Sequence, residues 1–265
     1  MHRTQITEIH QDVAAIVTAM TDSEQPFLHE TVSAILADPG IGQVVLCVEE
    51  KNTWINSTLG SLTTDPRLEV VHMPIAPLGA VRNRALSYVC LPWIAYCDGD
   101  DVWCKGKTLA QHTYANRMGC EFVGADHYLI NETGKICAYA FARNIPMPSS
   151  WMIRAEIMKQ YPFNETLRQA EDGEWWIRTK DQVHKVRYPK MFLKYRIRSN
   201  SLSSSTLSKQ RKAKVVALAE KPLLREIILI LTGCFWLLTR KREYVWLKSW
   251  GEETASTQSR KQHNS

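Results

Sequence analysis

The sequence of 265 residues has little of what marks fibrous, disordered or disulfide-stapled proteins. It holds 12 Gly, 11 Pro and 7 Cys, and 45% of its residues are hydrophobic, which is typical of one globular α/β domain with a small appendage. The cysteines are odd in number and contain no C-x-x-C pair, so neither a disulfide framework nor a zinc ribbon is indicated. Four of them lie in or beside apolar runs and are expected to be buried thiols: Cys47, Cys90, Cys97 and Cys120.

A basic start followed by an apolar stretch is also absent, so residues 1–12 do not resemble a secretory signal and we expect a cytosolic protein. Charge is nearly balanced in residues 1–208, with 21 Lys and Arg against 22 Asp and Glu. Residues 209–265, by contrast, hold 12 Lys and Arg against 5 Asp and Glu. Because these basic residues flank an apolar stretch, they favour contact with a membrane surface over binding to nucleic acid.

Short apolar runs recur along the first half of the chain, starting 24 to 31 residues apart with amphipathic segments between them. Strand, helix and strand at this spacing predict βαβ units. Nearly continuous apolar strands are typical of an open, mostly parallel twisted sheet with helices on both faces, which binds ligands at the carboxyl ends of its strands. The predicted strands are residues 13–18, 44–48, 68–72, 93–97 and 122–125.

The pattern changes after residue 126, where turn signals and aromatic residues predict a hairpin or an irregular excursion over residues 127–148. Helices are expected at 154–160 and from Glu171, and strands over 183–197. We predict three regions, namely a catalytic domain (1–208), a basic and apolar helical tail (209–250) and a disordered C-terminus (251–265).

Three carboxylates follow the predicted strand at residues 93–97 within four positions, Asp98, Asp100 and Asp101. Carboxylates this close do not ionise together easily without a cation, and a hard divalent metal prefers a few of them together with phosphate oxygens. The segment therefore predicts metal-assisted handling of a diphosphate. The alternative is a solvated acidic turn that caps the next helix.

This acidic segment resembles the DxD motif of glycosyltransferase family 2, whose members have the GT-A fold. Three further segments are similar to family motifs and occur in the same order: Pro77-Leu-Gly-Ala-Val-Arg-Asn-Arg-Ala-Leu86, Gln169-Ala-Glu-Asp-Gly-Glu-Trp-Trp-Ile-Arg178 and Lys194-Tyr-Arg-Ile-Arg-Ser-Asn-Ser-Leu-Ser203. An ordered set of four motifs is more specific than any single one. The resemblance covers roughly residues 13–205 and implies an inverting, metal-dependent transfer from a nucleotide-sugar donor to a glycan or glycolipid.

The resemblance also implies roles for the acidic residues. Asp98 and Asp100 would hold Mn²⁺ or Mg²⁺ on the donor diphosphate, with Asp98 near the ribose. Asp101 is either a ligand or a helix cap. Asp172 matches the base that takes the proton of the attacking hydroxyl, unless it is a plain helix N-cap, and Glu171 would orient the loop or contact the acceptor.

Further residues match positions that contact the nucleotide sugar in the family, namely Thr18, Glu49, Arg82, Asn83 and Arg198. The alternatives are a surface helix with Arg82 and Arg84 solvated, and a solvated Arg198 in a basic strand region. Trp175 or Trp176 would stack on an acceptor sugar, and because adjacent helix residues point about 100° apart, one of the two is expected in the core.

The C-terminal tail contains an uncharged stretch of 13 residues, 227–239, followed by three basic residues and by aromatic residues over 244–250. Thirteen residues are too few to span a bilayer, so the tail is either an interfacial anchor or a helix packed on the domain or in a dimer. Two rival functions remain, a degenerate membrane-attached partner subunit and a sugar nucleotidyltransferase. A sugar nucleotidyltransferase would need a Gly-rich, basic phosphate-binding loop after the first strand. Residues 18–26 contain no Gly, Lys or Arg, which counts against this alternative.

Overall fold

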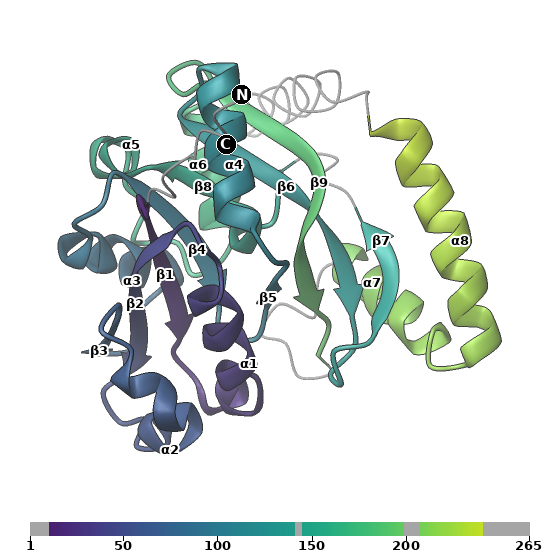
Figure 1. Cartoon of the computed structure of the whole chain (residues 1–265), viewed down its shortest axis with the longest axis horizontal. Coiled ribbons are helices and arrows are strands. Elements are labelled where there is room, and N and C mark those ends of the chain that lie inside the picture. Colours follow the sequence, from purple (N-terminus) through teal and green to yellow (C-terminus); the bar gives the residue numbers. More distant parts are fainter. Residues whose placement is uncertain (1–10, 141–144, 199–206, 241–265) are drawn as a thin grey trace, which may run out of the picture.

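The structure is a computed structural model that describes residues 11–140, 145–198 and 207–240. Its centre is a mixed sheet in the order β3-β2-β1-β4-β8-β6-β9-β5, and β7 pairs with β6 (Figure 1). The strands are β1 (Val13–Ala19), β2 (Ile41–Glu49), β3 (Leu68–Met73), β4 (Trp93–Asp98), β5 (Val102–Trp103), β6 (Phe122–Ile130), β7 (Ile136–Ala140), β8 (Met152–Arg154) and β9 (Lys185–Arg196).

Helices cover both faces of this sheet. The α-helices are α1 (Gln25–Leu36), α2 (Ile55–Leu59), α3 (Leu78–Ala85), α4 (Lys107–Met118), α5 (Ala155–Gln160), α6 (Glu171–Arg178), α7 (Leu207–Leu218) and α8 (Pro222–Thr239). Short 3-10 helices span Asp22–Glu24, Gly60–Thr64, Leu86–Tyr88 and Pro148–Ser150. Residues 1–10, 141–144, 199–206 and 241–265 lie outside the described residues. The aromatic segment 244–250 and the C-terminus predicted to be disordered (251–265) fall within these ranges.

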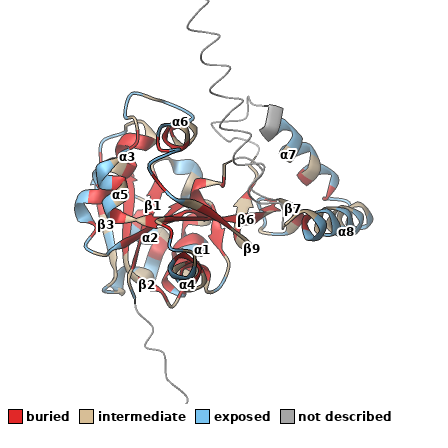
Figure 2. Ribbon diagram, turned by 90° about the horizontal axis from the view of Figure 1, so that it is seen from above, coloured by how far each residue is buried: buried red, intermediate tan, exposed pale blue. Residues whose placement is uncertain are grey.

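The first four strands are parallel, and every residue of β1 is buried. Their alternating side chains form two separate cores. Ala15 and Val17 belong to the cluster under α1 and α4, whereas Ala14 and Ile16 face α3, α5 and α6 (Figure 2). A parallel sheet needs cover on both faces, which explains the near-continuous apolar strands.

The register of this parallel sheet places the candidate site. Thr18 of β1 lies directly beside Asp98 of β4, both at the carboxyl ends of their strands. Pro26 favours the start of α1 in its first turn, and Gly119, in the left-handed region at φ 58°, ends α4. Each of these helices leads the chain back to another strand of the same sheet. The polar residues that follow the buried runs therefore gather along one edge.

The second half of the sheet is mixed. β8 runs antiparallel to β4 and to β6, whereas β9 runs parallel to β6 and antiparallel to β5. β6 and β7 form a hairpin whose turn contains Gly134 at φ 79°, which confirms the hairpin expected after residue 126. The five strands and the open, mostly parallel sheet predicted from the sequence are confirmed.

Helices α7 and α8 lie beyond the sheet edge and pack on the β6–β7 hairpin (Figure 1). A third apolar cluster, with Leu129 and Ala138 from the hairpin, Val216 from α7 and Ala219 just after it, holds them there. The 13 uncharged residues are part of the longer helix α8, the one helix of the described residues that is long and apolar enough to cross a membrane by length and composition. The domain boundary predicted near residue 208, between the α/β domain and the helical tail, stays a prediction.

The cysteines are all free in the described structure. Cys47, Cys97 and Cys120 are buried, as predicted. The prediction was wrong for Cys90, which is exposed because it follows the 3-10 turn at Leu86–Tyr88 and precedes β4 instead of lying within a strand.

Candidate active site

Asp98 ends strand β4 at the carboxyl edge of the sheet, and its side chain remains 32% exposed. Its Oδ1 accepts hydrogen bonds from Arg82 Nη2 at 2.9 Å and from Thr18 Oγ1 at 3.3 Å. The backbone N–H of Asp98 donates to Ser149 Oγ at 3.1 Å. These contacts fix the first carboxylate of the acidic segment while it still faces solvent.

Arg82 lies on α3 with its side chain only 1% exposed, between two carboxylates from distant parts of the chain. Its Nη1 donates to Glu171 Oε1 at 2.8 Å. Burial acts to lower the pKa of Arg82, but Asp98 and Glu171 together raise that pKa above its ordinary value. The guanidinium is therefore a permanent buried cation that joins the acidic segment after β4 to the start of α6.

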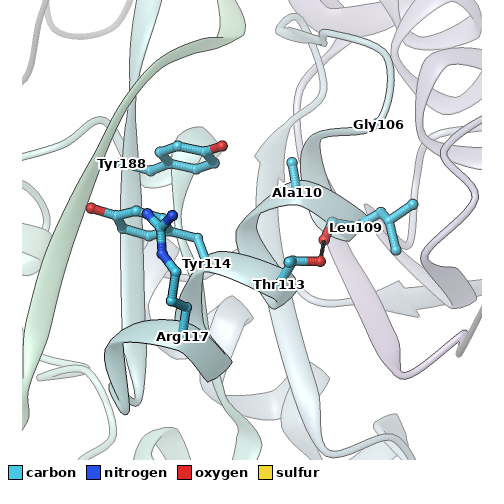
Figure 3. Close-up of a pocket in the computed structure, with 7 residues that line it drawn as sticks. All are labelled: Gly106, Leu109, Ala110, Thr113, Tyr114, Arg117 and Tyr188. Atoms are coloured by element: carbon cyan, nitrogen blue, oxygen red, sulfur yellow. Dashed lines mark hydrogen bonds between the residues drawn. The ribbon is translucent and has the colours of Figure 1, made fainter.

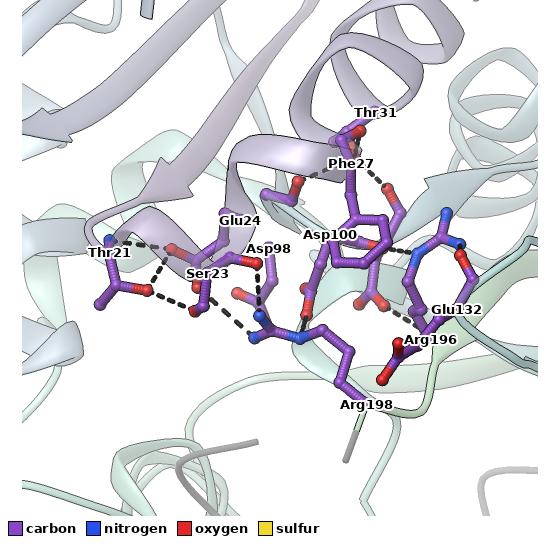
Figure 4. Close-up of polar contacts among 12 residues, drawn as sticks. Thr21, Ser23, Glu24, Phe27, Thr31, Asp98, Asp100, Glu132, Arg196 and Arg198 are labelled. Carbon is purple, nitrogen blue, oxygen red and sulfur yellow. Dashed lines mark hydrogen bonds and ion pairs between the residues drawn. The ribbon is translucent and has the colours of Figure 1, made fainter. Parts of the chain in front are cut away.

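Asp100 pairs with the second arginine of the site. Arg198 Nε lies 2.6 Å from Asp100 Oδ2, and Arg198 Nη2 lies 3.5 Å from Glu24 Oε1 (Figure 4). Burial raises the pKa of Asp100 to about 6; Arg198 opposes this rise, whereas Asp98 and Glu24 add to it. Arg198 is thus bound in the acidic cluster, and the alternative of a solvated surface residue is wrong.

Asp101 points away from this solvent-facing edge. It is completely buried, and its Oδ1 accepts the backbone N–H of Arg196 at 3.0 Å. Burial raises its pKa well above the ordinary value. Because α4 begins six residues later, at Lys107 with Gly106 as its N-cap, Asp101 is not the helix cap that the alternative interpretation expected. Its role is to hold β9 beside the acidic segment.

Glu171 and Asp172 are the first two residues of α6, which follows Ala170 in the left-handed region at φ 62°. Asp172 Oδ1 accepts the N–H of Gly173 at 2.8 Å, so the carboxylate lies at the positive end of the helix. Asp172 is not the N-cap, which is Ala170. Burial raises the pKa of Glu171 above its ordinary value, and the positive charge of Arg82 offsets part of this rise.

The described site therefore brings the acidic segment, Arg82, Arg198 and the first turn of α6 to one edge of a mostly parallel sheet. The chain is 27% identical over 149 residues to an uncharacterized glycosyltransferase of Methanocaldococcus jannaschii, MJ1057, an alignment covering 50% of this chain and 51% of that protein. The chain thus spans about half the length of the curated relative it matches. No family model matches the chain.

Solved structures with the same fold include S. aureus TarS 1–349 in complex with UDP-GlcNAc, with a TM-score of 0.60 at 14% identity over 78% of this chain and 66% of that one. The complex of the same protein with UDP gives a TM-score of 0.58 at 13% identity, covering 78% of this chain and 70% of TarS. The chain has the GT-A glycosyltransferase fold. The expected mostly parallel sheet with helices on both faces is that of this fold.

Within the GT-A fold, two of the predicted ligand contacts need correction. Trp175 is 0% exposed, and its indole Nε1 donates to the backbone oxygen of Tyr161 at 2.6 Å, so it cannot stack on an acceptor sugar. Trp176 is buried as well, because its ring packs against Phe122 of β6 and against Trp151. Both tryptophans, not one, belong to the core.

Asn83 also has a structural partner in place of a nucleotide. Its Nδ2 donates to the backbone oxygen of Phe163 and to Glu165 Oε1, and its Oδ1 accepts the N–H of Phe163, all between 2.9 and 3.0 Å. The side chain therefore ties α3 to the loop that precedes α6. Glu49 is the last residue of β2 and is partly exposed at the same carboxyl edge as Thr18.

Sequence reasoning missed Glu24 and Ser23, which contact Arg198 from the turn after β1. A signal for them was available. Thr21 and Glu24 form a capping box, the S/T-x-x-E pattern, in which Glu24 Oε2 accepts the backbone N–H of Thr21 at 2.8 Å (Figure 4). This local motif fixes the turn that delivers Glu24 to the acidic segment.

The donor set at this edge suits a hard divalent cation bound together with a diphosphate. Asp98 and Asp100 are both oxygen ligands, and Mg²⁺ usually takes one or two carboxylates plus phosphate oxygens. Among the described residues no group of three or more His, Cys, Asp or Glu side chains is placed to hold a metal. A metal held by Asp98 and Asp100 would need further ligands from outside this pair.

A separate hollow of about 350 Å³ lies between α4 and β9 (Figure 3). Tyr114 and Tyr188 stack there with ring centroids 4.1 Å apart, and the Arg117 guanidinium lies 4.9 Å from the Tyr114 ring. Tyr114 is only 9% exposed beside these two neighbours, so its ring offers little surface to a ligand.

Proposed function

We propose that this chain is a glycosyltransferase that moves a sugar from a nucleotide-diphosphate donor to a hydroxyl of a glycan or glycolipid, with inversion. The observation that carries the proposal is the pairing of Asp98 and Asp100 with Arg82 and Arg198 at the carboxyl edge of a GT-A sheet. A relative described as a glycosyltransferase and a TarS structure with bound UDP-GlcNAc support a UDP-sugar as the donor.

The donor diphosphate would lie over Asp98 and Asp100. When bound there, Mn²⁺ or Mg²⁺ would neutralise the phosphate charge that develops as the nucleoside diphosphate departs. Arg198 has its guanidinium at this edge, and it would have to exchange its contacts with Glu24 and Ser23 to turn an N–H pair to a phosphate. A planar guanidinium suits such bidentate recognition. Thr18 and Glu49, at the ends of β1 and β2, would contact the ribose and base in this proposal.

Asp172 would accept the proton of the attacking hydroxyl. Its carboxylate is held at the N-terminus of α6 by Gly173, and Arg82 links the neighbouring Glu171 to Asp98, so donor and base positions are set by one buried cation. A single base with direct displacement gives inversion at the anomeric carbon.

The test is thermal stability with UDP, GDP, CDP and dTDP, each with and without Mn²⁺, together with Mn²⁺ alone. A ligand at one hundred times its dissociation constant stabilises the folded state by about 2.7 kcal/mol. We expect a metal-dependent shift with UDP that is lost in Asp100→Asn and kept in the matched control Asp181→Asn, which removes an exposed carboxylate before β9. No shift with any nucleotide would refute the donor site and favour a degenerate partner subunit.

The base is tested separately by the slow release of UDP from UDP-GlcNAc in water. Asp172→Asn should retain the UDP-dependent shift but lose most of this release, since removal of a general base typically costs about 10²–10⁴-fold. Unchanged release in Asp172→Asn would show that another residue takes the proton.

A further inference from the structure

Helix α8 distributes its side chains in the opposite way to an ordinary surface helix. Its exposed side is almost entirely apolar, and the seven large hydrophobic residues on it are between 43% and 79% exposed. Of its 18 residues, Trp236 alone is buried. The large hydrophobic residues of the exposed side are Leu223, Ile227, Ile230, Leu231, Phe235, Leu237 and Leu238.

The packed side of α8, by contrast, carries the polar contacts. Thr232 Oγ1 accepts the backbone N–H of Tyr139 on β7 at 3.1 Å, and Trp236 Nε1 donates to Asp126 Oδ2 on β6 at 2.7 Å. A helix of a water-soluble surface turns its apolar stripe inward and its polar residues outward. The packed side of α8 is also partly apolar, because Ile228 packs on the cluster formed by the hairpin and Trp236 is buried. A surface helix that is apolar on its exposed side too is not made for water, which indicates that the outer side of α8 meets an apolar environment.

The exposed apolar residues form one continuous face. With about 100° between successive residues, they cover an arc of about 160°, and the exposed Glu226 lies at its margin. A hollow of about 520 Å³ where α8 meets the hairpin extends this face to Tyr128, Ile136 and Tyr139. Figure 2 shows α8 at the outer edge of the molecule, with most of its ribbon coloured as exposed.

Charge identifies the partner of this face. Lys221 precedes α8 and Arg240 follows it, and on α7 Arg211 and Lys214 are exposed. The sequence from residue 209 onward carries seven more basic than acidic residues. A second copy of the chain would bring the same positive charge against this face, whereas an anionic bilayer attracts it.

We propose that the exposed face of α8 is a membrane-docking surface that binds an anionic lipid bilayer with the helix lying in the interface. The helix lies on the bilayer instead of crossing it, because Thr232 and Trp236 hold its other side on β7 and β6. Leucine, isoleucine and phenylalanine would enter the acyl boundary while the flanking Lys and Arg contact headgroup phosphates. This surface is separate from the acidic edge of the sheet and does not depend on the proposed transfer reaction.

The first experiment measures partitioning of the full chain onto vesicles of phosphatidylcholine, alone or with about a third phosphatidylglycerol, by sedimentation. Wild type should bind the anionic vesicles and lose binding at high salt. Leu231→Glu should bind at least about tenfold more weakly, because it places a charge in the centre of the apolar face. The matched control Ile75→Glu changes an equally exposed residue far from α8 and should bind as wild type does.

The second experiment uses the native sequence at α8. Cys234 and Cys90 are the two exposed thiols of the described residues, and Cys234 lies within the apolar face. An environment-sensitive fluorophore on Cys234, in a Cys90→Ser background, should shift to the blue with anionic vesicles. The same probe on Cys90, in a Cys234→Ser background, should not.

The proposal is overturned by any of three results. These are no binding to anionic vesicles, equal loss of binding in Leu231→Glu and Ile75→Glu, or an unshifted probe on Cys234. A concentration-dependent dimer that Leu231→Glu abolishes, without vesicle binding, would assign the face to a second copy of the chain.

Discussion

Replacing Arg82 with methionine removes the buried cation between Asp98 and Glu171 but keeps a side chain of similar length. Removing one partner of a buried ion pair typically costs 3–5 kcal/mol, because an uncompensated charge stays behind. Asp98 is 32% exposed and can be solvated, whereas the Glu171 side chain is 10% exposed. We therefore expect the lower end of that range, a loss of about 3 kcal/mol in the free energy of unfolding, most of it from Glu171.

The loss should depend on pH. Burial already raises the pKa of Glu171, and without Arg82 it rises further above its unfolded value. The folded variant then binds a proton that the unfolded chain has released, so its stability is retained at low pH and falls as pH rises through the folded pKa of Glu171. Arg82→Met should accordingly be closer to wild type at pH 5 than at pH 8.

The assay is urea unfolding of Arg82→Met, of the double variant Arg82→Met with Glu171→Gln, and of Arg178→Met as a matched control. The double variant should recover about 1–2 kcal/mol, because no buried carboxylate is left unpaired. Arg178→Met breaks an exposed pair with Glu174 and should cost no more than about 1 kcal/mol. A loss below about 1 kcal/mol for Arg82→Met, or no recovery in the double variant, would refute the reasoning.

Two further predictions concern polar side chains outside the acidic edge, the partly buried Asn83 and the buried Lys107. Asn83→Ala should lower the free energy of unfolding, measured by urea unfolding, by about 2 kcal/mol, because three hydrogen bonds are lost. As a control, replacing the exposed neighbour Arg84 by Ala should change that free energy by no more than about 0.5 kcal/mol. Burial lowers the pKa of Lys107 to about 7, so the unfolded chain binds more protons between about pH 7 and 10 and stability should rise with pH across that window. Lys107→Met should reduce this rise of stability with pH without abolishing it, because the pKa of Lys185 is also lowered to about 7. If the stability of Lys107→Met rises with pH as steeply as that of wild type, Lys107 is not the group responsible.

The sheet could be predicted because each of its parallel strands is nearly continuous in apolar residues and carries its own local signal. Thr18 and Asp98 were placed at the same edge by the rule that parallel strands end together, and the register confirms their contact. The short strands β5 and β8 had no such signal, since two or three residues show no periodicity. They form because β9 and β4 offer them hydrogen bonds.

The partners of the charged side chains could not be predicted in the same way. Arg82 and Arg84 look alike in the sequence, yet two residues along a helix point about 200° apart, so that one is buried and the other exposed. Which of them turns inward depends on Glu171, 89 residues away. The sequence of α8 likewise shows an apolar stretch with basic flanks, but the polar contacts of Thr232 and Trp236 decide which side is left outside.

The acidic segment itself shows how tertiary contacts change a conclusion drawn from local sequence. Three carboxylates in four positions suggest that a cation is needed before they can ionise together. In the folded chain Arg82 pairs with Asp98, Arg198 with Asp100, and Asp101 is buried against the backbone of Arg196. Each of these two arginines also pairs with a glutamate, Glu171 for Arg82 and Glu24 for Arg198, so the arginines offset only part of the negative charge at this edge. A divalent cation at Asp98 and Asp100 would have to compete with Arg82 and Arg198 for the carboxylates. A diphosphate that engages Arg198 would free Asp100 for the cation, so metal and nucleotide binding should stabilise each other.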